Sequence, residues 1–187
     1  MVKKLLGLFE ENPIIAAIKN QSGLQSVLKS DCKIVFVLYG NVLNIVEIVQ
    51  QLKSQDKMVF VNVDLIEGFS SKEIVIELLK RDTHADGILS SKAGMIKAAK
   101  AHGFYTIHRL FIIDSFSFDN IEKQVSLSEP DALQILPGWP KLITWIKDKI
   151  DIPIITGGLI CLKEDVVAAL GAGAMAISST NEDVWAL

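Results

Sequence analysis

The sequence predicts an α/β protein that closes into one compact (β/α)8 barrel of the TIM type, with residues 1–187 as a single domain. Short runs rich in valine and isoleucine recur, and each is followed by a turn signal and a stretch of helical periodicity. Hydrophobic residues make up 50% of the chain, which supplies enough material for a core. The 187 residues leave about 23 for each of eight units, so the barrel must be lean.

The candidate strands are the apolar runs that precede the turn signals. They are residues 14–18, 33–39, 58–63, 85–89, 104–109, 131–136, 153–156 and 174–178. A doubly wound open sheet is the rival architecture, and a dinucleotide-binding sheet of that kind normally carries a G-x-G-x-x-G turn after its first strand. Residues 19–23 read Lys-Asn-Gln-Ser-Gly, which favours the barrel.

Several helix starts carry capping residues. Asn41 is expected to cap a helix whose apolar positions run from residue 42 to residue 52. Ser70 and Glu73 have the spacing of a capping box. Ser91 is expected to cap the helix that follows the fourth strand.

Other residues mark helix boundaries later in the chain. Gly103 and Gly171 stand where a helix ends and a left-handed residue is favoured. Pro140 suits the first turn of a helix, where its missing N–H has no cost. Trp145 falls on the apolar face of that helix and is expected in the core.

The cysteines and the N-terminus favour a cytoplasmic protein with no membrane partner. Cys32 and Cys161 form no C-x-x-C pair and are expected to be buried thiols, with no disulfide framework and no zinc site. The apolar stretch of residues 5–9 is too short for a signal peptide and runs into Glu10 and Glu11. No apolar run approaches the roughly 18 residues of a spanning helix.

Polar side chains follow the predicted strands at their C-terminal ends, where barrels of this type place their functional groups. Asp64, Lys92, His108, Arg109 and Gln134 stand at the ends of the third to sixth strands. Each has a structural alternative: an ion pair for Arg109, a cap or salt bridge for Asp64, and a hydrogen-bonded wall position for His108. Lys92 at a helix start is disfavoured by the helix dipole unless an anion binds there.

The last two strand ends indicate phosphate binding. Gly157 and Gly158 follow the seventh strand, and Ser178 and Ser179 end the eighth. Backbone N–H groups that converge on an anion are typical of phosphate sites in such barrels, and glycine lets the backbone approach closely. Ordinary turn and capping chemistry is the alternative interpretation.

Three tryptophans and a lysine stripe bear on nucleic acid binding. Trp139 and Trp185 follow strand-end loops, so we expect them to cover the pocket mouth or a partner surface, or to stack bases. Lys92, Lys97 and Lys100 could form a basic stripe along one helix, since Lys97 and Lys100 fall on the same side of it. A solvated helix face is the alternative interpretation. The chain has 19 basic and 22 acidic residues, and its net charge of −3 excludes indiscriminate nucleic acid coating.

Taken together, the strand-end motifs resemble those of the glycerol uptake operon antiterminator regulatory proteins. The matching segments are residues 85–92 (ADGILSSK), 109–115 (RLFIIDS), 130–132 (PDA), 136–138 (LPG), 153–160 (PIITGGLI) and 173–178 (GAMAIS), followed by Trp185. The resemblance spans essentially the whole chain. It implies a small (β/α)8 barrel without enzymatic activity that senses glycerol 3-phosphate and binds a leader mRNA.

The chain departs from the pattern of that family at three positions. His108 stands where the family pattern has glutamine, Gln134 where it has glutamate, and Thr156 where it has alanine. An amide in place of a carboxylate keeps acceptor capacity but adds donors and removes a charge. These changes leave the phosphate site intact and put the contacts to the other end of the ligand in question.

The leading hypothesis is therefore a glycerol 3-phosphate-responsive antiterminator with no catalytic residue, no cofactor and no metal. Arg109, Lys92 and the backbone at Gly157, Gly158, Ser178 and Ser179 would hold the phosphate, and Asp64 and Gln134 the hydroxyls. The alternatives are an isomerase or lyase for a phosphorylated metabolite, with Asp64, Lys92 or His108 as the acid or base, and a barrel that serves only in assembly. An acidic RNA-binding protein is also a candidate homo-oligomer, because pairing could assemble a basic groove.

Overall fold

The apolar runs form the strands of a closed parallel barrel in the computed structural model, which describes residues 2–187. Each strand pairs with the next, and β1 pairs with β8 to close the ring. The strands are β1 (Ile14–Ile18), β2 (Ile34–Val37), β3 (Met58–Asn62), β4 (Gly87–Ser90), β5 (Tyr105–Phe111), β6 (Ala132–Leu136), β7 (Ile154–Gly157) and β8 (Ala176–Ser179). The (β/α)8 prediction is confirmed, with every predicted strand present.

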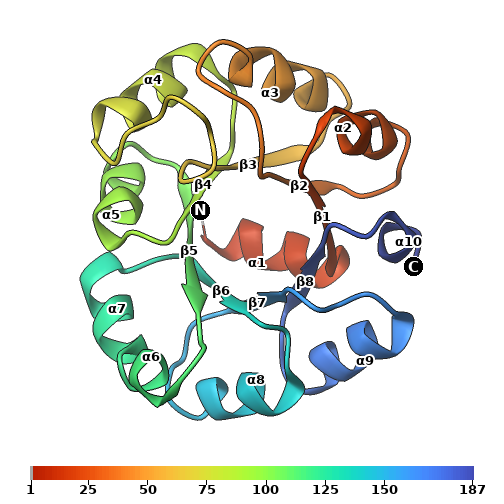
Figure 1. Ribbon diagram of the computed structural model, residues 1–187, viewed down its shortest axis with the longest axis vertical. Coiled ribbons are helices and arrows are strands. Elements are labelled where there is room, and N and C mark those ends of the chain that lie inside the picture. Colours follow the sequence, from red (N-terminus) through yellow and green to blue (C-terminus); the bar gives the residue numbers. More distant parts are fainter. Residues whose placement is uncertain (1) are drawn as a thin grey trace.

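Helices lie in every connection between successive strands and surround the barrel, while one further helix precedes β1 and another follows β8 (Figure 1). They are α1 (Val2–Glu11), α2 (Gln21–Leu28), α3 (Ile45–Lys53), α4 (Ile74–Asp82), α5 (Ala93–Ala101), α6 (Ser115–Asp119), α7 (Ile121–Ser128), α8 (Pro140–Lys147), α9 (Lys163–Gly171) and α10 (Glu182–Trp185). None of the described helices has the length and apolar character needed to cross a membrane.

Helix α1 closes the floor of the barrel, and the sequence did not predict it. Figure 1 shows α1 lying across the middle of the ring. Its Leu5 and Phe9 are fully buried among inward-facing strand residues, and the Phe9 ring centroid lies 6.4 Å from that of Phe60. Ile15, Ile34 and Phe60 belong to the same buried cluster, so α1 and the inward-facing strand residues form one core.

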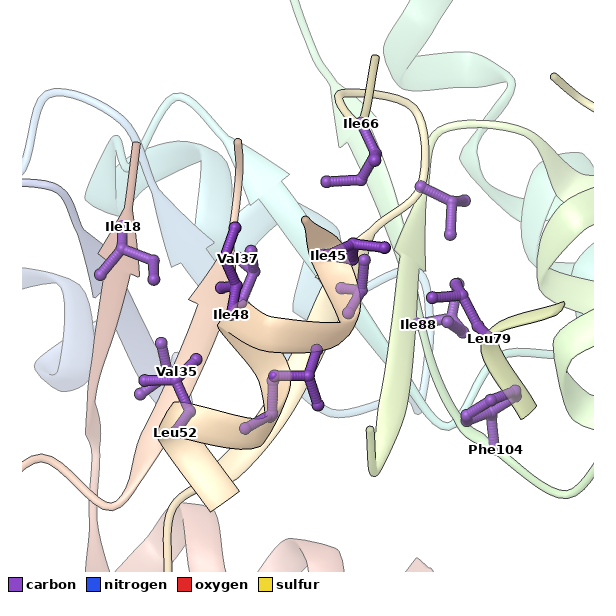
Figure 2. Close-up of a cluster of buried hydrophobic side chains, with 14 of the residues drawn as sticks. Ile18, Val35, Val37, Ile45, Ile48, Leu52, Ile66, Leu79, Ile88 and Phe104 are labelled. Atoms are coloured by element: carbon purple, nitrogen blue, oxygen red, sulfur yellow. The ribbon is translucent and has the colours of Figure 1, made fainter. Parts of the chain in front are cut away.

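The outer layer of the core lies between strands and helices. Figure 2 shows Ile48 of α3 beside Val37 of β2 and Leu52 beside Val35. Alternate residues of each strand face inward and outward, so one apolar strand contributes to both layers. This double burial explains why the strands read as unbroken apolar runs.

Three predicted helix starts are wrong. Helix α3 begins at Ile45 rather than after Asn41, whose side-chain oxygen instead accepts the N–H groups of Leu43 and Asn44 in a turn. Glu73 precedes α4 without any side-chain cap, so the capping box with Ser70 does not form. Lys92 occupies the position before α5 that Ser91 was expected to take.

The later boundary predictions are partly confirmed. Pro140 is the first residue of α8, and Gly103 has a φ of +75° after α5. Gly171 is the last residue of α9, and the left-handed position belongs to Gly173, with a φ of +104°. Trp145 is 43% exposed, so its predicted place in the core is wrong.

Candidate functional site

A pocket of about 180 Å³ opens at the C-terminal end of the barrel, the end opposite α1. Five of the predicted site residues line it: Arg109, Gln134, Gly158, Ser178 and Ser179. They meet because parallel strands end at one edge, with Arg109 paired in register with Gln134 and Gly157 with Ser178. Residues from the last four strand ends therefore meet in one pocket.

Gln134 carries an unused acceptor in this pocket. Its side chain is buried, with only 4% exposed, and its Nε2 donates to Ser178 Oγ at 2.8 Å. Ser178 Oγ donates onward to the Thr156 carbonyl at 3.3 Å. Gln134 Oε1 has no hydrogen-bond partner among the described residues. A buried acceptor without a partner costs about 1–3 kcal/mol, so the site favours a ligand that supplies a donor.

Arg109 carries an unused donor beside it. Its Nε is buried and has no hydrogen-bond partner within the part of the chain that the structure describes. Its guanidinium carbon lies 4.9 Å from the centroid of the Phe111 ring. Burial lowers the pKa of Arg109, and the charge of Asp64 partly opposes that shift. The pocket thus places a cationic donor and a neutral acceptor together, both without partners.

The glycine pair shapes the pocket in two ways. A Cβ on Gly157 would lie 2.5 Å from Ser178 Oγ and 3.5 Å from Gln134 Nε2, so glycine leaves room for that hydrogen-bonded pair. Gly158 has a φ of +72°, and its carbonyl accepts the Gly138 N–H at 3.0 Å. Gly158 lines the pocket, whereas Gly157 does not line it and instead leaves the space that Ser178 occupies.

Replacing Gly157 with alanine is expected to damage the pocket while leaving the barrel folded. The new Cβ must displace Ser178, which we expect to cost about 1–3 kcal/mol of unfolding free energy and to abolish ligand binding. Gly171→Ala is the matched control, because nothing lies within 4 Å of its added Cβ at the end of α9. Denaturant unfolding of both variants checks this prediction, and equal stability would contradict it.

The remaining predicted residues, Asp64, Lys92 and His108, form a neighbouring cluster that does not line the pocket. Asp64 accepts hydrogen bonds from Ser90 Oγ at 2.8 Å and from the Ser91 N–H at 2.5 Å. Lys92 Nζ lies 3.9 Å from Asp64 and donates to Ser71 Oγ. The Asp64 carboxylate is thus engaged by the loop that follows β4.

His108 is fully buried and connects two elements. Its Nε2 lies 3.2 Å from the Ser91 carbonyl, and its Nδ1 lies 2.8 Å from Ser128 Oγ on α7. Burial lowers the pKa of His108, opposed by the Ser91 carbonyl and by Asp64. A carbonyl only accepts, so Nε2 carries the hydrogen and the ring holds the β4 loop against α7.

Because His108 is buried with a lowered pKa, the unfolding free energy is expected to fall on acidification. Its pKa in the folded state lies below the ordinary value of 6.5, so the unfolded chain binds more protons as pH falls through that value. The contribution of neutral His108 to the unfolding free energy is fully present above pH 6.5 and declines as the pH falls below that value. His108→Gln should flatten the decline in unfolding free energy between about pH 7.5 and 5.5. If the unfolding free energies of the wild type and His108→Gln decline in parallel with pH, His108 is not the group responsible.

Cys161 and Asn181 line the pocket although neither was among the predicted site residues. Cys161 was expected to be buried, but it is exposed and lines the pocket. Asn181 Nδ2 donates to the Cys161 carbonyl at 3.0 Å, and Ser179 Oγ donates to the Ile160 carbonyl at 2.9 Å. Trp185 is buried, and its Nε1 donates to the Ser179 carbonyl at 2.8 Å. These bonds tie the end of β8 to the loop after β7.

The comparisons with known proteins identify relatives of this chain. The family model of the glycerol-3-phosphate responsive antiterminator matches residues 14–185. A protein of Escherichia coli (strain K12) named "Uncharacterized protein YgcP" is 52% identical over 184 residues, which cover 98% of this chain and 96% of that protein. These matches extend over nearly the whole length of both chains.

Solved structures give the same result. A glycerol uptake operon antiterminator regulatory protein from Listeria monocytogenes is 31% identical with a TM-score of 0.89, over 92% of this chain and 94% of that one. A related protein from Thermotoga maritima is 27% identical with a TM-score of 0.83, over 94% and 99%. Deoxyribose phosphate aldolase from Aeropyrum pernix, 12% identical with a TM-score of 0.71 over 98% and 95%, shares the fold alone. This chain therefore belongs to the family of glycerol-3-phosphate responsive antiterminators.

Proposed function

We propose that this protein binds glycerol 3-phosphate in the pocket at the C-terminal end of the barrel and, in response, binds the leader mRNA of a glycerol-utilisation operon. The observation that carries the proposal is the pair of unpartnered buried atoms, Arg109 Nε and Gln134 Oε1, in one pocket of a family member. A phosphate with a neighbouring hydroxyl satisfies both atoms at once.

The Arg109 guanidinium is the group that holds the phosphate in this proposal. Its planar donors match two phosphate oxygens, and low local polarity strengthens the pair. Gly158, Ser178 and Ser179 line the same pocket, and in this proposal their backbone N–H groups also contact the phosphate. Asp64, Lys92 and His108 then support the β4 loop and do not contact the ligand, which changes the roles expected for Asp64 and Lys92.

Gln134 receives the other end of the ligand. Its Nε2 is occupied by Ser178, so its Oε1 is left to accept a hydroxyl hydrogen. A pocket of about 180 Å³ is smaller than the roughly 300–1,000 Å³ of sites for larger ligands, which suits a three-carbon phosphate.

The composition of the pocket supports a sensor rather than a catalyst. Within residues 2–187, its lining includes no carboxylate and no imidazole, the groups that most often transfer protons at neutral pH. His108 is enclosed between Ser91 and Ser128. Binding of leader mRNA during transcription places the protein in the cytoplasm.

Ligand-dependent stability and RNA retention test the proposal together. Unfolding free energy should rise by about 2.7 kcal/mol at a glycerol 3-phosphate concentration of about 100 Kd, and less with glycerol or inorganic phosphate alone. A leader mRNA should be retained more strongly when the ligand is present. Turnover of the ligand, or RNA retention that ignores it, would overturn the proposal.

A further inference from the structure

An exposed aromatic groove lies beside the ligand pocket, between α6 and α8. Its volume is about 250 Å³, and its walls include Phe118, Trp139 and Trp145. The Trp139 and Trp145 ring centroids are 5.7 Å apart with an interplanar angle of 75°, and those of Phe118 and Trp145 are 6.1 Å apart at 70°. Trp139 is 51% exposed, so much of its ring is open to solvent. Clustered exposed rings of this kind mark an interaction surface.

Lysine ammonium groups border these rings. Lys141 Nζ lies 5.0 Å from the centroid of the Trp145 ring, and Lys149 Nζ lies 4.4 Å from that of Phe118. Lys149 also lies 3.6 Å from Asp119, whereas Lys141 has no carboxylate within ion-pair distance among the described residues. Rings that stack bases, bordered by cations that meet phosphates, are what a single-stranded nucleic acid requires.

One acidic side chain lines the groove. Asp114 accepts the Ser117 N–H at 2.7 Å, and its carboxylate has further acceptor capacity. It repels phosphate but accepts hydrogen bonds from the N–H groups on base edges. An RNA bound here would therefore place base edges rather than phosphates next to Asp114.

The segment that carries Trp139 also contacts the ligand pocket. Leu136 lines the pocket, and Pro137 lines the groove. The Gly138 N–H donates to the Gly158 carbonyl at 3.0 Å, and the Ile160 side chain fills the space where a Cβ on Gly138 would lie. The residue before Trp139 is therefore in direct contact with a residue that lines the pocket.

We propose that this groove binds unpaired bases of RNA, with Trp139 and Trp145 as stacking surfaces and Lys141 beside the RNA backbone. The inference rests on the proposed function and adds the RNA surface to it. A second copy of the chain is the competing occupant. Lysine is depleted in interfaces between proteins, so lysines placed against the rings favour RNA.

The test uses the full chain and an RNA pool with a randomised single-stranded segment, with glycerol 3-phosphate present. Trp139→Ala should weaken binding of the enriched RNA roughly tenfold, and Trp139→Phe should restore most of it because a ring remains. Lys141→Ala should weaken binding and lower the salt slope by about one. Two control variants alter exposed side chains away from the groove: Lys97→Ala on α5, and Leu43→Ala just before α3. Helix α3 lies across the ring from α8 (Figure 1). Both variants should bind the RNA as tightly as the wild type.

Each result decides a different point. Wild-type RNA binding that survives both Trp139→Ala and Lys141→Ala overturns this inference and leaves the proposed function standing. A wild type that retains no RNA from the pool, with or without ligand, overturns the RNA-binding part of the proposed function and this inference with it. A change of molecular mass in Trp139→Ala with unchanged RNA affinity identifies the groove as an interface between copies and overturns the inference.

Discussion

Arg109→Ala is expected to abolish stabilisation by glycerol 3-phosphate. The gain of about 2.7 kcal/mol at about 100 Kd should fall to nearly zero, because the variant removes the one cationic side chain that lines the pocket in the described chain. The unliganded protein should lose little stability, since the deleted Nε is a buried donor without a partner. Binding and folding are thereby separated in one variant.

The other arginine of the chain provides the control. Arg81 is exposed on α4 and forms an ion pair with its neighbour Asp82 at 2.5 Å. Arg81→Ala keeps the ligand response and changes net charge by the same amount as Arg109→Ala. Thermal or denaturant unfolding at matched ligand concentrations makes the comparison. A ligand response that persists in Arg109→Ala would place the phosphate elsewhere.

Phe9→Ala is expected to be among the most destabilising single changes in the protein. The ring is fully buried against the inward side chains of the barrel floor, and its loss leaves a cavity that the strands cannot collapse to fill. The expected cost is about 3–5 kcal/mol of unfolding free energy. Chemical denaturation with a two-state fit measures it.

Phe116→Ala is the matched control, because this ring is 78% exposed on α6. Its unfolding free energy should stay within about 0.5 kcal/mol of the wild type. Phe9→Ala should also keep its ligand response where it remains folded, because the pocket is at the opposite end of the barrel. Equal stability of the two variants would show that α1 does not support the floor.

The strands were predictable because a parallel strand covered on both faces must be apolar throughout. β1 matches its predicted range, and β5 extends two residues beyond its range to Phe111, where the chain rises into the loops. Helix α1 was not predictable on the same grounds. Leu5, Leu8 and Phe9 have the spacing of one helix face, but the strands that bury this face are distant in sequence, so its place on the barrel floor is not encoded locally.

The errors at helix starts have a common physical cause. A serine or asparagine at a suitable spacing can cap a helix or bond elsewhere, and its neighbours in space decide which. Ser91 bonds Asp64 instead of capping α5, and Asn41 forms a turn ahead of α3. Trp145 fails for a related reason, because helical periodicity marks a wide face and only part of that face meets the barrel.

The candidate site was likewise only partly predictable from the sequence. The closed barrel and the residues at its strand ends were predictable, because both follow from strand periodicity and chain order. The folded chain was needed to show that Arg109 and Gln134 share a pocket, while Asp64 turns toward the loop after β4 and Lys92 toward Asp64 and Ser71. Side-chain direction at a strand end depends on which partners the neighbouring loops supply, and those partners come from segments that the chain brings together only on folding.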